Sequence, residues 1–188
     1  MGYSQIELDD VQAKWDLRFP PDLIELLREC RPLVDHQECF DWVTAEPKLI
    51  KFWLDWPFEG YWRTVQRAGA WWPEWGERPR KFGEQREKLR GIFANAPTLI
   101  PLLGHRFIPD EPSETGNPVF SVFHSDIVYY GANLLDWLAR ECWTGGPASP
   151  WPPVKEIRFW SDAVRHFNDQ SRMLKGGWPD RRKGTAGR

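Results

Sequence analysis

Residues 117–143 constrain the fold more than any other part of the chain, because two strand patterns, a tight turn and a helix follow one another there. Residues 119–123 are apolar on both alternating faces except at Ser121, which is typical of a strand buried within a sheet. His124, Ser125 and Asp126 form a polar turn. Residues 127–130 are β-branched and aromatic and end at Gly131, so we expect a short second strand that pairs antiparallel with the first.

A helix is predicted to follow this hairpin directly. Asn133 is a typical N-terminal capping residue, and Asp136 places a negative charge near the positive end of the helix dipole. The predicted helix has one broad apolar face, formed by Leu134, Leu135, Leu138, Ala139 and Cys142.

Helices and extended segments are predicted on both sides of this stretch. We expect helices over residues 6–15, from the Pro20-Pro21 pair to about residue 30, and over 82–96, with Phe82 facing inward and Glu84 and Lys88 paired on the surface. Residues 99–109 predict two short extended runs about Gly104. The remaining segments are expected to be a loop at 31–47 with a short strand or helix near 40–43, an aromatic, loop-rich layer at 52–75, an acidic loop at 110–117, a linker at 145–153, and a turn at 157–162 leading into a helix that Ser161 caps.

Several of these segments resemble the SUKH superfamily, specifically the domain of the fungal cell-wall-synthesis regulator and its bacterial relatives. The similarity rests on ordered motifs across residues 20–168: Trp53-x-Asp55-Trp56-Pro57-x-Glu59-Gly60, Trp72-x-x-Trp75-Gly76-x-Arg78-Pro79, Leu99-Ile100-Pro101-x-x-Gly104-His105-Arg106, Asn117-Pro118-Val119-Phe120-Ser121-Val122, Asp126-Ile127-Val128-Tyr129-Tyr130-Gly131 and Ile157-x-Phe159-Trp160-Ser161. The resemblance implies protein binding without catalysis and no cofactor. It also implies an α+β fold, in which helices pack over a central, mostly antiparallel β-sheet.

Length and charge set the expected domain organisation. A chain of 188 residues is most simply one domain, here residues 1–168, followed by a basic tail at 169–188 that we expect to be disordered. Residues 1–59 contain 13 acidic and 6 basic side chains, whereas residues 172–188 contain 1 acidic and 6 basic ones. The acidic N-terminal third argues against nucleic-acid binding by the folded domain and favours a basic partner.

The expected compartment is the cytoplasm. The first ten residues include Glu7, Asp9 and Asp10 and have no apolar core of a signal peptide. No apolar run approaches the length needed to span a membrane. Three cysteines, an odd number, favour free thiols in a reducing environment.

The partner-binding surface is predicted on acidic and aromatic residues. Nine aromatic residues lie between Phe52 and Trp75; most of them are expected to be buried, because tryptophan is highly buried on average. Aromatic residues are also enriched in protein interfaces, and stacked rings would suit a carbohydrate-binding module instead. The candidate partner-binding residues are Trp56, Glu59, Trp71, Asp110, Glu111 and Glu114.

Two kinds of chemistry compete with this interpretation. Cys30, His36 and Cys39 provide three metal ligands within ten residues, but a structural zinc site needs four ligands and the spacing matches no standard motif, so no metal site is predicted. A hydrolase could use His105 or His124 with Asp126 and the hydroxyl of Ser121 or Ser125. Ser121 lies in the middle of a predicted strand rather than on an exposed turn, and no catalytic residue is predicted.

The leading hypothesis is therefore a non-catalytic, protein-binding domain. Within the family that it resembles, it would be an immunity-type protein that neutralises a cognate toxin by covering the toxin's active surface. The alternatives are a regulatory scaffold for endogenous partners and, from other classes, a hydrolase or a carbohydrate-binding module. The sequence predicts neither the identity of the partner nor the oligomeric state.

Overall fold

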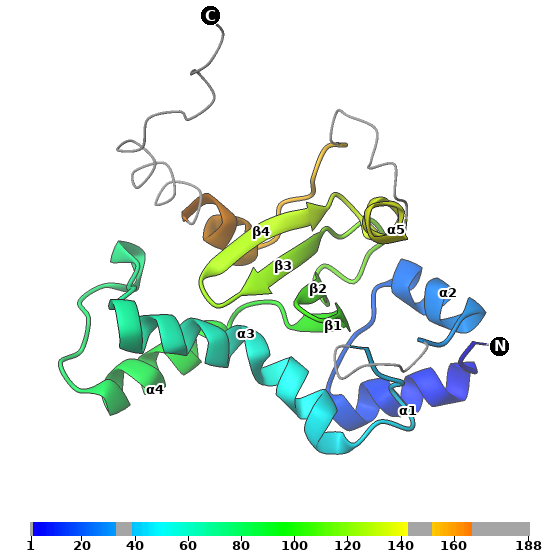
Figure 1. Ribbon diagram of the computed structural model, residues 1–188, viewed down its shortest axis with the longest axis horizontal. Helices are drawn as coiled ribbons and strands as arrows, with labels where there is room; N and C mark the ends of the chain where they lie inside the picture. The colour runs from blue at the N-terminus through cyan, green and yellow to red at the C-terminus, as the bar shows by residue number, and fades with distance from the viewer. Residues whose placement is uncertain (1, 33–38, 143–151, 167–188) are drawn as a thin grey trace, which may run out of the picture.

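The computed structural model describes residues 2–32, 39–142 and 152–166 and has an α+β architecture (Figure 1). Two helices come first, α1 (Gln5–Trp15) and α2 (Pro21–Glu29), followed by the long α3 (Pro47–Ala68), the short 3₁₀ helix η1 (Pro73–Trp75) and α4 (Phe82–Phe93). Four strands form one antiparallel sheet in the order β1 (Leu99–Leu103), β2 (Arg106–Pro109), β3 (Val119–Phe123) and β4 (Asp126–Gly131). Helix α5 (Leu134–Cys142) follows β4, and residues 160–166 are helical.

The predicted hairpin and its following helix are confirmed. Phe123 pairs with Asp126 across the β3–β4 turn, in which His124 takes a left-handed φ of 61°. The Asn133 side chain accepts a hydrogen bond of 2.9 Å from the Asp136 amide and so caps α5. Strands β1 and β2 likewise form on either side of Gly104.

The register of the sheet gives its two faces different chemistry. Phe107 pairs with Phe120, and Phe120 pairs with Tyr129, so these rings lie on one face, where Phe120 also approaches Trp160 with ring centroids 6.5 Å apart. Arg106 pairs with Ser121 on the opposite face. The Ser121 hydroxyl accepts a hydrogen bond of 3.1 Å from the Arg106 guanidinium, which explains the polar residue in the middle of an apolar strand.

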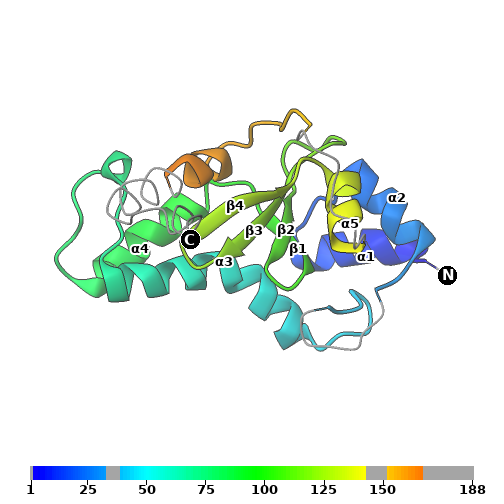
Figure 2. The ribbon, with the colours of Figure 1, turned by 45° about the horizontal axis from the view of Figure 1, so that its top comes forward.

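Helices α3 and α5 pack on the sheet, and α4 lies beside α3 (Figure 2). Helix α3 packs against β1 and β3, α4 packs against α3, and α5 packs against β4. The Trp56 indole donates a hydrogen bond of 2.9 Å to the Val122 carbonyl. At Gly60, an added Cβ would lie 3.3 Å from the Cα of His124. This spacing is tighter than most Cβ contacts, so glycine allows α3 to cross close to the β3–β4 turn.

The N-terminal helices are joined to the following chain by a small polar network. The Ser4 hydroxyl accepts from the Glu7 amide while the Glu7 carboxylate accepts from the Ser4 amide, a capping box at the start of α1. Arg31 forms ion pairs with Glu7 at 2.5 Å and with Asp41 at 3.5 Å, and its guanidinium lies 4.3 Å from the centre of the Tyr3 ring.

Some local predictions were wrong. Residues 52–68 belong to the 22-residue helix α3 and not to a loop-rich layer; Pro57, which lacks an amide hydrogen, lies inside this helix and obscured its pattern. Phe82 is 57% exposed rather than inward-facing. Glu84 pairs with Lys81 at 3.2 Å, while Lys88 donates to the Glu77 carbonyl. Residues 40–43 form neither strand nor helix.

The other differences concern the C-terminal part of the described chain. Leu135, placed by the sequence on the apolar face of α5, is 77% exposed. The Ser161 hydroxyl accepts from the Ile157 amide at 2.7 Å and from the Tyr129 hydroxyl at 2.6 Å, so it joins the helical segment to β4 from a position inside the helix. The predicted disordered tail and most of the predicted linker lie outside the described residues.

Candidate functional site

An exposed aromatic patch lies where α3 meets the β3–β4 turn. Phe52 on α3 is 47% exposed and Phe123 at the end of β3 is 52% exposed. The half-buried Trp56 lies between them, with its ring 5.5 Å from that of Phe52 and 6.1 Å from that of Phe123. We call these three residues the aromatic patch. Because Trp56 is fixed to β3 through its indole, the patch is a preorganised surface of the type that is enriched in protein interfaces.

The polar residues beside this patch are the ones that a hydrolase would use. His124 packs edge-on against Trp56 and close to Phe123, with ring centroids 6.0 and 4.7 Å apart. Burial raises the pKa of Asp126, and the charge of His105 partly opposes the shift. The Ser121 hydroxyl is bonded to Arg106, whose guanidinium stays protonated and cannot accept its proton. His124 therefore packs against the aromatic patch, and Ser121 is hydrogen-bonded within the sheet.

Asp110 is buried, unlike the other two acids of its loop. Its side chain is placed inside the fold, 8% exposed, with one carboxylate oxygen lacking a hydrogen-bond partner among the described residues. Burial raises the pKa of Asp110; a backbone hydrogen bond with Thr98 opposes this, and the charge of Glu111 adds to it. Asp110 is therefore less accessible to a partner than the sequence suggests, because its position after the end of β2 carries it into the fold, and its contact with a partner stays a prediction.

Glu111 and Glu114 are exposed, as predicted, but both are paired within the chain. Glu111 pairs with Arg158 at 3.3 Å and Glu114 pairs with Lys155 at 3.2 Å. These two pairs tie the acidic loop to residues 152–166. They leave less negative charge for a partner than the sequence suggests, although surface pairs of this kind are weak.

Glu59 and Trp71 also have partners within the fold. Glu59 pairs with Arg86 of α4 at 2.5 Å. The Trp71 indole donates to the Gly76 carbonyl at 2.9 Å, and Lys88 lies 5.7 Å from the Trp71 ring. Of the six candidate residues, the structure brings Trp56 alone into the aromatic patch.

The tryptophan rings expected to serve a carbohydrate are not arranged as an exposed platform. Trp72 and Trp75 are stacked at 4.6 Å, but Trp72 is only 6% exposed. Trp71 stands at 89° to Trp75. Trp72 also stacks on Phe159 at 5.5 Å, so this cluster joins η1 to the C-terminal helical segment.

The cysteine cluster can be followed in part. Cys30 is exposed and its thiol donates a hydrogen bond of 3.4 Å to the Leu26 carbonyl, while His36 lies outside the described residues. Among the residues that the structure describes, no three cysteine, histidine or acidic side chains are grouped as a metal site would require. Within the same residues, no helix is long and apolar enough to cross a membrane.

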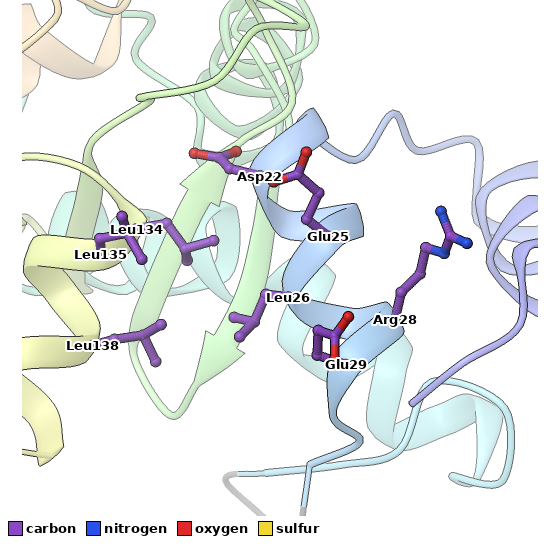
Figure 3. Close-up of a pocket in the computed structure, with 8 residues that line it drawn as sticks. All are labelled: Asp22, Glu25, Leu26, Arg28, Glu29, Leu134, Leu135 and Leu138. Atoms are coloured by element: carbon purple, nitrogen blue, oxygen red, sulfur yellow. The ribbon is translucent and has the colours of Figure 1, made fainter. Parts of the chain in front are cut away.

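Sequence reasoning missed a groove between α2 and α5 (Figure 3). It has a volume of about 610 Å³ and is lined by Asp22, Glu25, Leu26, Arg28, Glu29, Leu134, Leu135 and Leu138. The broad apolar face of α5 was the available signal for this groove. Five apolar positions cover more of this nine-residue helix than packing against one edge of a sheet requires.

Comparisons with known proteins add no assignment to these surfaces. The sequence matches no model of a known protein family, and neither a curated protein nor a solved structure matches it.

Proposed function

We propose that this chain is a SUKH-type, non-catalytic protein-binding domain that acts as an immunity-type protein. In this role it neutralises a cognate toxin by covering the toxin's active surface. The proposed family and the toxin-neutralising role rest on the resemblance of the ordered sequence motifs to the SUKH superfamily. The α+β architecture, with its antiparallel hairpin followed directly by a capped helix, is compatible with that resemblance.

The aromatic patch is the observation that carries the binding part of this proposal. Phe52 and Phe123 expose about half of their surfaces although each is large and apolar, and they come from two elements that Trp56 holds together. Aromatic residues are enriched in protein interfaces, where truncating a single central residue costs about 1–4 kcal/mol of binding free energy. Packing within the described chain gives no reason for their exposure.

The polar residues near the patch support binding rather than catalysis. Arg106 holds the Ser121 hydroxyl, lies with its guanidinium carbon 3.6 Å from the centre of the Tyr130 ring, and approaches Glu141 at 3.8 Å. This arrangement connects β2, β3, β4 and α5. The residues of this arrangement, Arg106, Ser121, Tyr130 and Glu141, therefore have a structural role in the fold. A nucleophile or a general base would lose such contacts when it reacts.

Co-expression with a toxin tests the proposal. The toxin domain encoded beside this gene is expressed in a sensitive host with the native chain or with a Phe52→Ser, Phe123→Ser double variant. We expect the native chain to restore growth and the double variant to bind the purified toxin at least about tenfold more weakly. Phe82→Ser is the matched control, because Phe82 is also exposed but lies on α4.

Two outcomes would count against this function. Full protection by the double variant would remove the aromatic patch from the interface. Failure of the native chain to protect against or bind the neighbouring toxin would reject the immunity role, and reproducible binding to endogenous regulatory proteins would then favour the scaffold alternative.

A further inference from the structure

The α2–α5 groove is apolar at its floor and acidic along one side. Leu26 of α2 faces Leu134 and Leu138 of α5 across the gap in Figure 3. Leu135 is 77% exposed at the α5 side. A neighbouring hollow of about 320 Å³ shares Leu26 and Leu138 and continues over β1. The apolar floor therefore extends beyond the two helices themselves.

The exposed leucine results from the way α5 sits on the sheet. Leu134 is 2% exposed because it points into the core. Strand β4 packs closely against α5 beside it, since a Cβ added to Gly131 would lie 2.6 Å from the Cβ of Trp137. Leu135 is the next residue along a helix that turns 100° per residue, so the same placement turns it away from the sheet. Packing cannot bury both residues unless a second surface covers this side of α5.

The charge along the groove is negative and largely uncompensated. Glu25 and Glu29 are exposed on α2 at i,i+4 spacing, where like charges repel, and among the described residues neither has an ion-pair partner. Asp22, which also lines the groove, accepts hydrogen bonds from the Gly116 and Leu23 amides. Arg28 is the single basic residue that lines the groove, and in Figure 3 it points away from the leucines.

We propose that the α2–α5 groove binds an amphipathic, basic helix of a protein partner. Leucine-type side chains of that helix would pack on Leu26, Leu135 and Leu138, while lysine or arginine side chains beside them would meet Glu25 and Glu29. This is the helix-in-groove mode of recognition, in which apolar anchors recur at i, i+3, i+4 and i+7. A basic apolar occupant satisfies both the leucine floor and the uncompensated acids, which a neutral or acidic helix would leave unpaired.

This surface is separate from the aromatic patch. The patch lies at the β3–β4 turn, whereas α5 begins beyond the opposite end of β4. The inference therefore does not depend on the proposed immunity function, and the two can fail independently. A single chain with both surfaces could hold two partners, or two parts of one partner, at once.

A designed peptide provides a direct test. The probe is a fluorescent peptide of about 14 residues, roughly four helical turns, with leucine at i, i+3, i+4 and i+7 and lysine at the flanking positions. Its binding to the full chain is measured by fluorescence anisotropy at about 50 and 200 mM salt. We expect saturable binding that weakens with salt. A scrambled peptide of the same composition and a version with glutamate in place of lysine should bind at least about tenfold more weakly.

Variants locate the binding to the groove. Glu25→Lys with Glu29→Lys, and separately Leu135→Ser, should each weaken binding by about tenfold or more. Glu87→Lys is the charge control, because Glu87 is exposed on α4 and lines neither hollow. All of these positions are exposed, so circular dichroism and thermal melts should be unchanged. Equal binding of the scrambled peptide, or unchanged binding by the groove variants, would overturn the proposal.

A second copy of the chain is the competing occupant. We expect sedimentation of the native chain to show no dimer that is disrupted by the Leu135→Ser substitution. A dimer that this substitution breaks, with peptide binding lost as the dimer forms, would assign the groove to self-association instead.

Discussion

On the tryptophan-rich side of the molecule and in the α2–α5 groove, the exposure of apolar side chains is the opposite of what the amino-acid composition suggests. The side formed by α3, η1, α4 and the residues around 160 has the highest aromatic density, yet its rings mostly pack on one another: Trp72 on Trp75 and Phe159, and Phe93 on Trp160 at 5.9 Å. The groove has a simple leucine-rich pattern, yet Leu135 is the most exposed large hydrophobic residue in the described chain.

The two sides also differ in whether their charged side chains have partners. On the tryptophan-rich side, Arg78 donates to the Val65 and Gly69 carbonyls and to the Gln85 side chain, and Arg86 pairs with Glu59. In the described part of the groove, Glu25 and Glu29 form no ion pair. The comparison teaches that most of the aromatic density here reports packing, with the aromatic patch as the exception, while the unpaired acids and the most exposed leucine lie at the sparser side.

The largest expected difference between the two sides is in stability. Trp72→Ala should lower the free energy of unfolding by about 3–5 kcal/mol, because it removes a buried ring that the rings of Tyr61, Trp75, Phe159 and His166 contact. Leu135→Ala, at an exposed position, should change it by about 0.5 kcal/mol or less. Urea denaturation followed by circular dichroism measures both. Comparable losses at the two positions would contradict the contrast.

Gly131 tests whether the close packing of β4 against α5 sets the position of Leu135. A Cβ at this position would lie 2.6 Å from the Cβ of Trp137 and 2.8 Å from its amide nitrogen, so Gly131→Ala should cost about 1–3 kcal/mol of stability. Gly91→Ala is the control, because a Cβ added to this residue of α4 would meet nothing within 4 Å, and the substitution should stabilise the chain by about 0.5–1 kcal/mol. Thermal melts of both variants would show opposite shifts.

Arg78 tests the claim that charges on the tryptophan-rich side are structural. Arg78→Met keeps much of the side-chain length but removes the guanidinium donor to the Gly69 carbonyl and one of the two donors to the Val65 carbonyl, which also accepts from the Gly69 amide. The substitution should cost about 1–2 kcal/mol. Arg80→Met is the matched control at an exposed position, where we expect about 0.5 kcal/mol or less. If both substitutions have the same effect in urea denaturation, the contacts of Arg78 do not stabilise the fold.

The smallest expected effect is on the pH dependence of stability. It distinguishes acidic residues of the N-terminal third that stabilise the fold from those that do not. The Ser4 amide, the Arg31 guanidinium and the Ser4 hydroxyl lower the pKa of Glu7 from 4.5 to about 2. A carboxylate with a lowered pKa stabilises the fold above its ordinary pKa, and this contribution is lost as the pH falls from about 4.5 to about 2. Glu7→Gln should therefore be less stable than the native chain at neutral pH, with the difference disappearing near pH 2.

Asp10→Asn provides the control for this pH dependence, since Asp10 is exposed on the same helix. Its stability should follow that of the native chain across the whole range. Equal pH profiles for Glu7→Gln and the native chain, measured by urea denaturation at several pH values, would remove the structural role of the capping box.

Local sequence patterns predicted much of the secondary structure. The paired prolines start α2, Gly104 separates β1 from β2, and the alternation in residues 119–130 specifies an antiparallel hairpin. These features depend on backbone restriction and on side-chain periodicity, which act over a few residues. Helix α3 was missed because Pro57 is a strong local signal against a helix, and packing against β1 and β3 outweighs it.

The sequence by itself determined the antiparallel hairpin and the cap at Asn133, because each follows from interactions between near neighbours in the chain. The α+β class was expected from the resemblance to the SUKH motifs and not from any local pattern. Only the tertiary structure decided which apolar and acidic residues remain available to a partner. Asp110 is buried while Glu25 is free, and Leu134 is buried while Leu135 is exposed. Neighbouring residues with the same chemistry differ in exposure because burial depends on how whole helices rest on the sheet, which no local pattern specifies.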